Sequence, residues 1–329
     1  MNQSLLSYGV GALLYCPADS KNIVSSLTEE RFGACFSLAL CLEDTIKDTC
    51  VASAEITLKE SFRRLWEQKD RLSFFLPQIF IRVRTPEQIE RLVRDLGETA
   101  AILTGFIFPK VSPENLPAFL DALARVNAER HAGLYAMPIL ENPAMFPPAS
   151  RMDFLYRIKK ELDAVPDRIL NIRVGGNDLC HAFGLRRHTD DTIYDILPVA
   201  GLLSDILTVF SEDYVLSAPV WEYYGGSHWE TGMQRELKKD LLNGFIGKTV
   251  IHPKQIPVVN GMLAVSPEDY SDACAIVDWD PLSKRLVSAG VSKNRMNEQK
   301  THTRWAEKTL LLAHLYGIRR SPTHPPDSE

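Results

Sequence analysis

Short apolar runs alternate with helix-like segments along the first 265 residues of this 329-residue chain. Most of these runs are continuously apolar, which is typical of parallel strands that are buried on both faces. The predicted strands cover residues 12–16, 37–42, 78–83, 105–108, 133–140, 169–174, 214–220 and 246–251.

A segment with helical periodicity follows each predicted strand. Pro86 begins the third helix, since its fixed φ suits the first turn. The predicted helices cover residues 20–31, 49–66, 86–96, 113–130, 150–162, 192–210, 231–242 and 253–263. Eight consecutive strand–helix units predict an α/β fold, a (β/α)₈ TIM barrel.

A doubly wound open sheet is the alternative fold. It would normally have fewer strands and a glycine-rich phosphate turn after the first one. Cys16-Pro17-Ala18-Asp19 stands at that place, so the barrel is favoured.

The pattern changes after residue 265, which divides the chain into three predicted parts. Residues 1–265 form a TIM-barrel catalytic domain, and residues 266–318 form a C-terminal helical extension. In the extension we predict helices over 267–278 and 305–316, separated by a polar segment. Residues 319–329 form a tail with three prolines that we expect to be disordered.

Composition narrows the functional classes. Apolar residues make up 45% and charged residues 24%, enough for a full-sized core. The net charge of −5 argues against nucleic-acid binding, which needs a basic face. No apolar run approaches the roughly 18 residues that span a membrane, so we predict neither nucleic acid nor membrane as a partner.

The location is predicted to be cytoplasmic. The apolar stretch 5–15 has no preceding Lys or Arg, and Tyr15-Cys16-Pro17 is not a small-residue cleavage site, so we interpret it as a buried first strand. The six cysteines contain no C-x-x-C pair, and we expect reduced thiols.

Polar residues follow almost every predicted strand. In a TIM barrel the carboxyl ends of the strands carry the chemistry. These ends therefore supply the candidate site residues, which are Tyr15, Asp19, Glu43, Asp44, Arg82, Arg84, Lys110, Glu141, Asn142, Asp178, Glu222 and His252.

Four carboxylates among them, Glu43, Asp44, Glu141 and Asp178, are expected to face at least two cations, Arg82 and Lys110. Crowded carboxylates repel one another unless a cation or protons compensate them. Oxygen ligands suit Mg²⁺, with Mn²⁺ as the alternative. Such a metal could polarise a keto acid and stabilise an enolate, while an arginine holds a substrate carboxylate.

Two further motifs carry less weight. Gly247-Lys248-Thr249 matches the end of a P-loop, but Leu242 occupies the position of the required first glycine. His181, three residues after Asp178, could join a metal site, although a structural role is favoured for it.

Seven segments together resemble the citrate lyase β-subunit-like family of the HpcH/HpaI aldolase superfamily. The resemblance covers about residues 1–310 and is greatest to the divergent C–C bond lyases of tellurium-resistance-type gene clusters. The segments are residues 13–17, 42–44, 81–83, 108–111, 139–141, 175–179 and 244–256, the last being the most specific.

The resemblance implies a barrel that cleaves or forms C–C bonds in small acids with Mg²⁺, often as CoA thioesters. By position, Glu141 and Asp178 match the family's metal-binding carboxylates. Arg82 matches the arginine that holds the substrate, and Glu43 and Asp44 match the acidic pair near the metal's waters.

We add Tyr15 and Lys110 to Arg82 as substrate-binding residues. In some relatives an Asp in a Met-x-Asp segment reaches a neighbouring subunit's site as the acid. Met296-Asn297-Glu298 occupies that place, so Glu298 is a catalytic candidate. The resemblance also leads us to expect a homo-oligomer, a trimer or a hexamer.

Departures from the family argue against CoA. Ala18 and Asn22 stand where CoA-using relatives carry a Gly and an Arg. Val51 and Glu55 replace a Lys and an Arg. The phosphates of CoA need charge-assisted partners, so a CoA moiety is doubtful here.

The sequence thus predicts a Mg²⁺-dependent C–C bond lyase or aldolase that acts on a small carboxylated substrate, a hydroxy or keto acid, through a metal-stabilised enolate. Two alternatives stay open. One is a non-catalytic ligand-binding barrel. The other is a phosphoenolpyruvate/pyruvate-type Mg²⁺ enzyme, which shares the same acidic rim.

Overall fold

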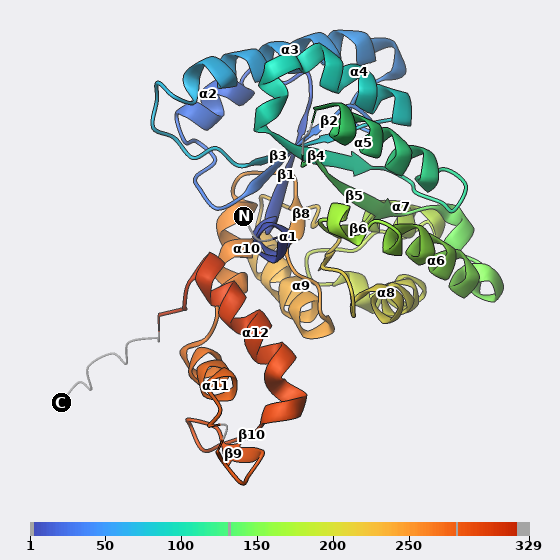
Figure 1. Ribbon diagram of the computed structural model, residues 1–329. Helices are drawn as coiled ribbons and strands as arrows, with labels where there is room; N and C mark the ends of the chain where they lie inside the picture. The colour runs from blue at the N-terminus through green and yellow to red at the C-terminus, as the bar shows by residue number, and fades with distance from the viewer. Residues whose placement is uncertain (1–2, 131–132, 281, 321–329) are drawn as a thin grey trace. The chain divides into compact units, whose positions relative to one another are not determined.

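A computed structural model describes residues 3–130, 133–280 and 282–320 (Figure 1). The chain divides into two compact units, Met1–Val259 and Asn260–Glu329, each with its own core. The division falls inside helix α10 (Gln255–Leu263). Residues 321–329 of the tail that we expect to be disordered lie outside the described residues.

Eight parallel strands form the sheet of the first unit, in the order β7-β6-β5-β4-β3-β2-β1-β8. A parallel bridge between Ala218 and Lys248 links the two ends of this order, so the sheet nearly closes into a barrel. The predicted TIM-barrel architecture is confirmed. The strands are β1 (Ala12–Pro17), β2 (Ser37–Cys41), β3 (Gln78–Arg82), β4 (Leu103–Phe108), β5 (Tyr135–Leu140), β6 (Ile172–Val174), β7 (Leu216–Ser217) and β8 (Lys248–Val250).

Helices surround this sheet, as Figure 1 shows. Apart from α10, they are α1 (Gln3–Gly9), α2 (Ile23–Thr28), α3 (Val51–Gln68), α4 (Pro86–Leu96), α5 (Leu116–Arg130), α6 (Pro148–Asp163), α7 (Gly176–Ala182), α8 (Leu197–Phe210) and α9 (Trp229–Asn243). Helix α4 begins at Pro86 as predicted, with Thr85 in extended backbone before it.

The barrel interior is a packed apolar core. Leu13, Ala39, Phe80, Ile107 and Met137, one from each of the first five strands, belong to one buried cluster. Each of the five has 0% of its surface exposed. Side chains thus fill the barrel, and chemistry is left to the strand ends.

Three local predictions are wrong. The stretch 5–15 is not one strand, since Gln3–Gly9 forms α1 and β1 begins at Ala12. The predicted strand 214–220 is reduced to the two residues of β7. The predicted helix 192–210 is broken, because a short 3₁₀ turn (Ile193–Asp195) precedes α8, which starts with Pro198 in its first turn.

The second unit contains α11 (Pro267–Val277), β9 (Val287–Ala289), β10 (Met296–Glu298) and α12 (Gln299–Tyr316). The two strands pair antiparallel within the segment expected to be polar and irregular. Ala273 and Ile276 of α11 pack against Ala306 of α12 in a small core.

Two further observations bear on the sequence predictions. In the part of the chain that the structure describes, no helix is long and apolar enough to cross a membrane. None of the six cysteines, all of which lie in the described ranges, forms a disulfide.

Candidate functional site

A cavity of about 250 Å³ opens at the carboxyl ends of the strands. Five of the predicted site residues line it, and they come from β1, β3, the loops after β2 and β5, and the first turn of α7. The lining residues are Tyr15, Asp44, Thr45, Arg82, Ile139, Glu141, Arg173, Val174, Gly175, Gly176, Asn177, Asp178, Val220, Thr249 and Ile251.

Arg82, the last residue of β3, lies at the centre of the acidic groups. Its Nη2 atom is 2.8 Å from Glu43 Oε2, 2.9 Å from Asp44 Oδ2 and 3.1 Å from Glu141 Oε1. The arginine side chain is only 9% exposed, so these ion pairs are poorly screened by water. The structure therefore brings Arg82 and three predicted carboxylates together.

Lys110 completes this group from the loop after β4. Its Nζ atom is 2.7 Å from Glu43 Oε1 and 2.9 Å from Asp44 Oδ1. The residue has φ +50°, a left-handed conformation that is uncommon outside glycine. This backbone directs the Lys110 N–H to Glu141 Oε1 at 3.0 Å. We call Glu43, Asp44, Arg82, Lys110 and Glu141 the rim cluster.

Glu141 is the most buried carboxylate of the rim cluster, with 2% of its side chain exposed. The hydrogen bonds from Arg82 and from the Lys110 backbone both end on Oε1. Its Oε2 atom lies beside Gly175, where a Cβ would stand 2.0 Å away. Gly175 therefore leaves room for this carboxylate, and a larger residue would displace it.

The pKa values of two rim carboxylates shift in opposite directions. Burial raises the pKa of Glu141 to about 8; the charge of Arg82 opposes the shift, and the charge of Asp178 adds to it. For Asp44, burial also acts to raise the pKa, but the hydrogen bond from Lys110 and the charge of Arg82 outweigh it and lower the pKa. Glu141 thus lacks enough positive charge to hold its ionised form at neutral pH.

Asp178 lies in the first turn of α7, next to Glu141 in the cavity wall. A carboxylate there interacts favourably with the positive end of the helix. Within the described residues, no three His, Cys, Asp or Glu side chains are grouped to hold a metal ion by themselves. Mg²⁺ needs only one or two protein carboxylates, because water and substrate oxygens complete its shell.

Other sequence candidates lie elsewhere. His181 is exposed on α7 and does not line the cavity. Glu298 is the last residue of β10 in the second unit, where its backbone N–H donates to His302 Nδ1 at 3.0 Å. Its predicted role at a neighbouring subunit's site remains a prediction.

Arg173 of β6 is a cavity residue that the strand-end search missed. It is 2% exposed, and its Nη2 donates to Thr249 Oγ1 at 2.6 Å. Arg82 and Arg173 both stand next to last in their predicted strands, 78–83 and 169–174, but only Arg82 was predicted as a site residue. A charged residue within an apolar strand was the signal that could have revealed Arg173.

A second group of charges, the sealed cluster of Arg187, Glu236, Asp240 and Lys248, lies between α9, β8 and the loop after α7. Lys248 Nζ is 2.8 Å from Glu236 Oε1 and 2.7 Å from Asp240 Oδ2. Arg187 Nε is 3.1 Å from Glu236 Oε2. All four side chains are at most 2% exposed, and two cations balance two carboxylates.

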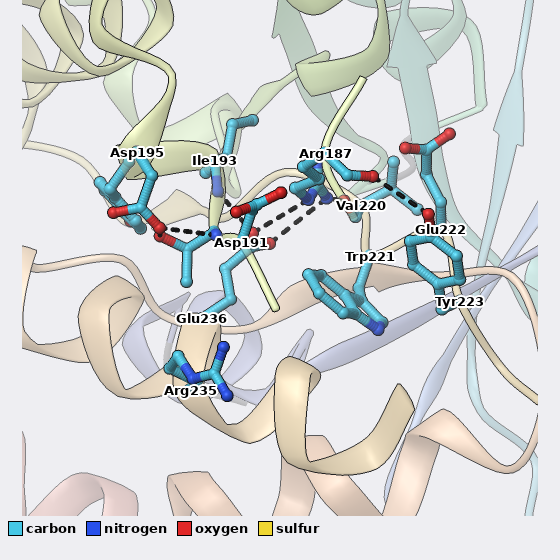
Figure 2. Close-up of polar contacts among 12 residues, drawn as sticks. Arg187, Asp191, Ile193, Asp195, Val220, Trp221, Glu222, Tyr223, Arg235 and Glu236 are labelled. Carbon is cyan, nitrogen blue, oxygen red and sulfur yellow. Dashed lines mark hydrogen bonds and ion pairs between the residues drawn. The ribbon is translucent and has the colours of Figure 1, made fainter. Parts of the chain in front are cut away.

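The sealed cluster anchors loops that border the cavity. Figure 2 shows Glu236 between Arg187 and the backbone of Ile193, whose N–H donates to Oε2 at 2.8 Å. Arg187 Nη2 donates to the carbonyl of Val220, a cavity residue, and its guanidinium stacks over Trp221. The cluster therefore fixes the backbone of the cavity wall.

Comparison with solved structures identifies the same fold elsewhere. A citrate lyase from Burkholderia xenovorans LB400 has a TM-score of 0.71 at 15% identity, covering 95% of this chain and 94% of that chain. CitE of Mycobacterium tuberculosis, in complex with magnesium, acetoacetate and coenzyme A, has a TM-score of 0.59 at 20% identity, covering 92% and 98%. RipC from Yersinia pestis has a TM-score of 0.51 at 17% identity, covering 78% and 95%.

At these identities the likeness shows the shared fold. A sequence search of curated proteins finds no match. A family model does match, over residues 4–318, and it describes a C–C bond lyase of the TIM-barrel fold. This match spans both the barrel and most of the second unit. The chain therefore belongs to the C–C bond lyase family of the TIM-barrel fold.

Proposed function

We propose that this lyase is a Mg²⁺-dependent enzyme that cleaves or forms a C–C bond next to a carboxylated end of a small hydroxy or keto acid. The observation that carries the proposal is the cavity in which Arg82 lies beside Glu141, with Asp178 in the same wall. One cation for a substrate carboxylate and two carboxylates for a metal are the groups that this chemistry needs.

The residues fit a magnesium ion. Gly175 leaves room for the Glu141 carboxylate in the cavity wall, and Glu141 and Asp178 repel each other without a cation between them. These two side chains would hold the ion. When bound, Mg²⁺ supplies a Lewis acid that polarises a substrate carbonyl and stabilises negative charge on its oxygen.

The other residues of the site bind substrate and move protons. Arg82 would hold the substrate carboxylate, with Tyr15 of β1 and Lys110 beside it. Glu43 and Asp44, held in place by Arg82 and Lys110, would accept the proton from the substrate hydroxyl on cleavage. The substrate carbon that leaves would do so as an enolate.

Relatives of similar fold support this proposal. The CitE protein of Mycobacterium tuberculosis carries magnesium and acetoacetate in its solved complex. Both belong to the chemistry proposed here, a divalent ion next to a small carboxylated molecule.

Coenzyme A is left out of the proposal, although that CitE complex contains it. Glu55 stands where CoA-using relatives carry a cation, and its side chain is held by hydrogen bonds to neighbouring residues. Its Oε1 accepts from Gln88 Nε2 and from Arg91 Nη2, both at 2.6 Å. The residues at this position therefore offer no free cation to a phosphate.

An Asp178→Ala variant tests the metal assignment. We expect the affinity for Mg²⁺, measured by calorimetry, to fall at least about 100-fold, because one of two protein ligands is removed. Asp153→Ala, an exposed position of α6, is the matched control and should bind as the parent does. Unchanged affinity in Asp178→Ala would contradict the assignment.

Proton–deuterium exchange tests the enolate. The protein is incubated in D₂O with Mg²⁺ and a panel of enolisable acids and thioesters, and exchange at the carbon next to the carbonyl is followed by NMR. We expect exchange with at least one acid and none with Asp178→Ala. Tight binding of phosphoenolpyruvate together with phosphoryl transfer would instead favour the phosphoenolpyruvate/pyruvate-type alternative.

We also propose that the protein is a homo-oligomer, a trimer or a hexamer, in which Glu298 serves a neighbouring subunit. Mixing tests this role, because Glu298→Gln and Asp178→Ala subunits each lack a different half of the shared site. If the two inactive variants are mixed and exchange subunits, activity should return. Activity that stays absent in verified mixed oligomers would disprove the role of Glu298.

A further inference from the structure

Arg173 is a buried cation without a buried anion. Its side chain lines the cavity, yet the residue is only 2% exposed. Thr249 Oγ1 accepts from Nη2 at 2.6 Å, and the phenol of Tyr15 interacts with the guanidinium. Across the described residues, its Nε and Nη1 atoms have no hydrogen-bond partner, and no carboxylate forms an ion pair with it.

Burying an unpaired guanidinium costs free energy of folding unless a bound group pairs with it. A guanidinium stays protonated in proteins, so Arg173 cannot escape burial by losing its charge. Burial acts to lower the pKa of Arg173, and the nearby charge of Arg82 acts in the same direction. Two orphaned donor atoms and an unpaired charge therefore call for an acceptor that carries negative charge.

Arg187 of the sealed cluster shows the contrast. It is just as buried, and among the described residues its Nε and Nη1 atoms also lack a hydrogen-bond partner. Its charge, however, is paired with Glu236 at 3.1 Å, and Arg187 does not line the cavity at the strand ends. Arg173 differs in both respects, because it has only hydroxyl neighbours and it faces a cavity.

The cavity has room for the missing anion. Its volume of about 250 Å³ corresponds to about eight water molecules at roughly 30 Å³ each. Arg82 lines the same cavity, and its Nε atom is also without a partner. Two arginines with unused donors thus contribute to one small chamber from different strands, β3 and β6.

We propose that Arg173 binds a second carboxylate of the substrate, which makes the substrate a small dicarboxylic hydroxy or keto acid. This inference rests on the proposed function, in which Arg82 and the metal ligands bind the first carboxylate. Arg173 is then the residue that selects diacids over monoacids. An arginine suits this task because planar carboxylates match its donors.

A pair of stable acids tests the proposal. Malate and 2-hydroxybutyrate share the hydroxy acid end and differ in a carboxylate or a methyl group at the other end. With Mg²⁺ present, we expect malate to bind at least about tenfold more tightly in calorimetry, as a charge-assisted hydrogen bond provides. Arg173→Met should remove this preference and leave the affinity for 2-hydroxybutyrate within about twofold.

Controls separate binding from folding. Arg157→Met removes an exposed arginine of α6 that pairs with Glu114, and it should keep the malate preference. Arg173→Lys keeps the positive charge and should keep part of the preference for malate. Without ligand, Arg173→Met should melt no lower than the parent protein, since it removes an unpaired buried charge. Arg173→Gln is the second neutral variant if Arg173→Met fails to fold.

The outcomes distinguish the two proposals. Equal binding of both acids, unchanged in Arg173→Met, would contradict the diacid assignment and leave the proposed function standing. If Arg173 raises the affinity for 3-phosphoglycerate more than the affinity for malate, Arg173 selects a phosphate group. That result would also contradict the diacid assignment. Failure of all three acids to bind with Mg²⁺ would contradict both proposals.

Discussion

The barrel unit holds two clusters of charged residues that resemble each other in composition and differ in setting. The rim cluster adjoins a cavity, and Asp44 and Lys110 are 44% and 45% exposed in their side chains. The sealed cluster is closed off, with at most 2% exposure. Both combine arginine, lysine and carboxylates at ion-pair distance.

The two sites differ in whether their buried charges are paired with one another. In the sealed cluster, two cations balance two carboxylates, and Tyr194 and Ile193 donate to the carboxylate oxygens. In the cavity wall, Glu141 is short of positive charge and Arg173 is short of negative charge. A cluster whose buried charges are paired with one another supports the fold, whereas one that leaves buried charges unpaired next to a cavity is suited to bind a ligand.

The largest expected effect concerns Lys248 of the sealed cluster. Lys248→Met leaves Glu236 and Asp240 buried without their cation, which should lower the free energy of unfolding by about 3–5 kcal/mol. Urea denaturation measures this loss. A loss as small as that of a surface lysine would contradict the structural role of the cluster.

The stability that Lys248→Met loses should depend on pH. Burial raises the pKa of Asp240 to about 6, and Lys248 opposes that shift. An acid whose folded pKa exceeds its unfolded value makes the folded state bind more protons, so stability falls as pH rises from about 4 to 6. Without Lys248 the carboxylate is harder to ionise, and the loss should therefore be larger at pH 8 than at pH 5.

Gly175→Ala should separate activity from folding. The new Cβ would lie 2.0 Å from Glu141 Oε2, so the carboxylate must move from its place. We expect turnover to fall about 100-fold, as for the loss of a positioned charged group. Gly201→Ala in α8 is the control, since its Cβ would meet nothing within 4 Å, and it should raise stability by about 0.5–1 kcal/mol.

Tyr194→Phe probes one hydrogen bond of the sealed cluster. The half-buried Tyr194 donates its hydroxyl hydrogen to Oδ1 of the buried Asp240 at 2.8 Å. Removing it should cost about 1.5–3 kcal/mol in urea denaturation, because the acceptor is charged. Turnover per folded molecule should be unchanged. A loss of turnover without a loss of stability would contradict the structural role of the sealed cluster.

The smallest stability effect is expected at Lys110 of the rim cluster. Lys110→Met removes ion pairs that are about half exposed, so unfolding should change by less than about 1 kcal/mol. Turnover should nevertheless fall about tenfold or more, because Glu43 and Asp44 lose the cation that positions them. Equal stability losses for Lys110→Met and Lys248→Met would contradict the inferred difference between the rim cluster and the sealed cluster.

Much of the fold could be predicted because buried parallel strands are continuously apolar. The predicted helix 86–96 agrees with α4, since Pro86 marks its start. The strand 214–220 could not be predicted correctly, because its residues are apolar enough for a strand but only Leu216–Ser217 pair as one. Burial sets the apolar pattern, whereas pairing depends on the register of neighbours.

The site was partly predictable for the same reason. Residues after each strand end meet at one rim, and Arg82 with Glu43, Asp44 and Glu141 do so. Arg173, a charged residue inside an apolar strand, could have been predicted as a site residue, but only the structure shows which partners it lacks.

The sealed cluster was missed for another reason. Glu236 and Asp240 lie four residues apart within a helical pattern, where charged residues usually face solvent. Lys248 was examined only as part of a P-loop ending. Burial of all three residues depends on how α9 packs against β8, which local sequence does not record.

The two-residue strand β7 gives the barrel a seam. Across it, Ala218 and Lys248 form an isolated bridge, whereas β1 and β2 pair over five residues. Three backbone hydrogen bonds join the two sides, from Ile246 to Leu216, from Ala218 to Gly247 and from Thr249 to Ala218. The hydrogen bond from Arg173 of β6 to Thr249 of β8 adds a side-chain link. We expect evolution to retune substrate size most readily at this seam, since changes there leave the long ladders of the opposite wall intact.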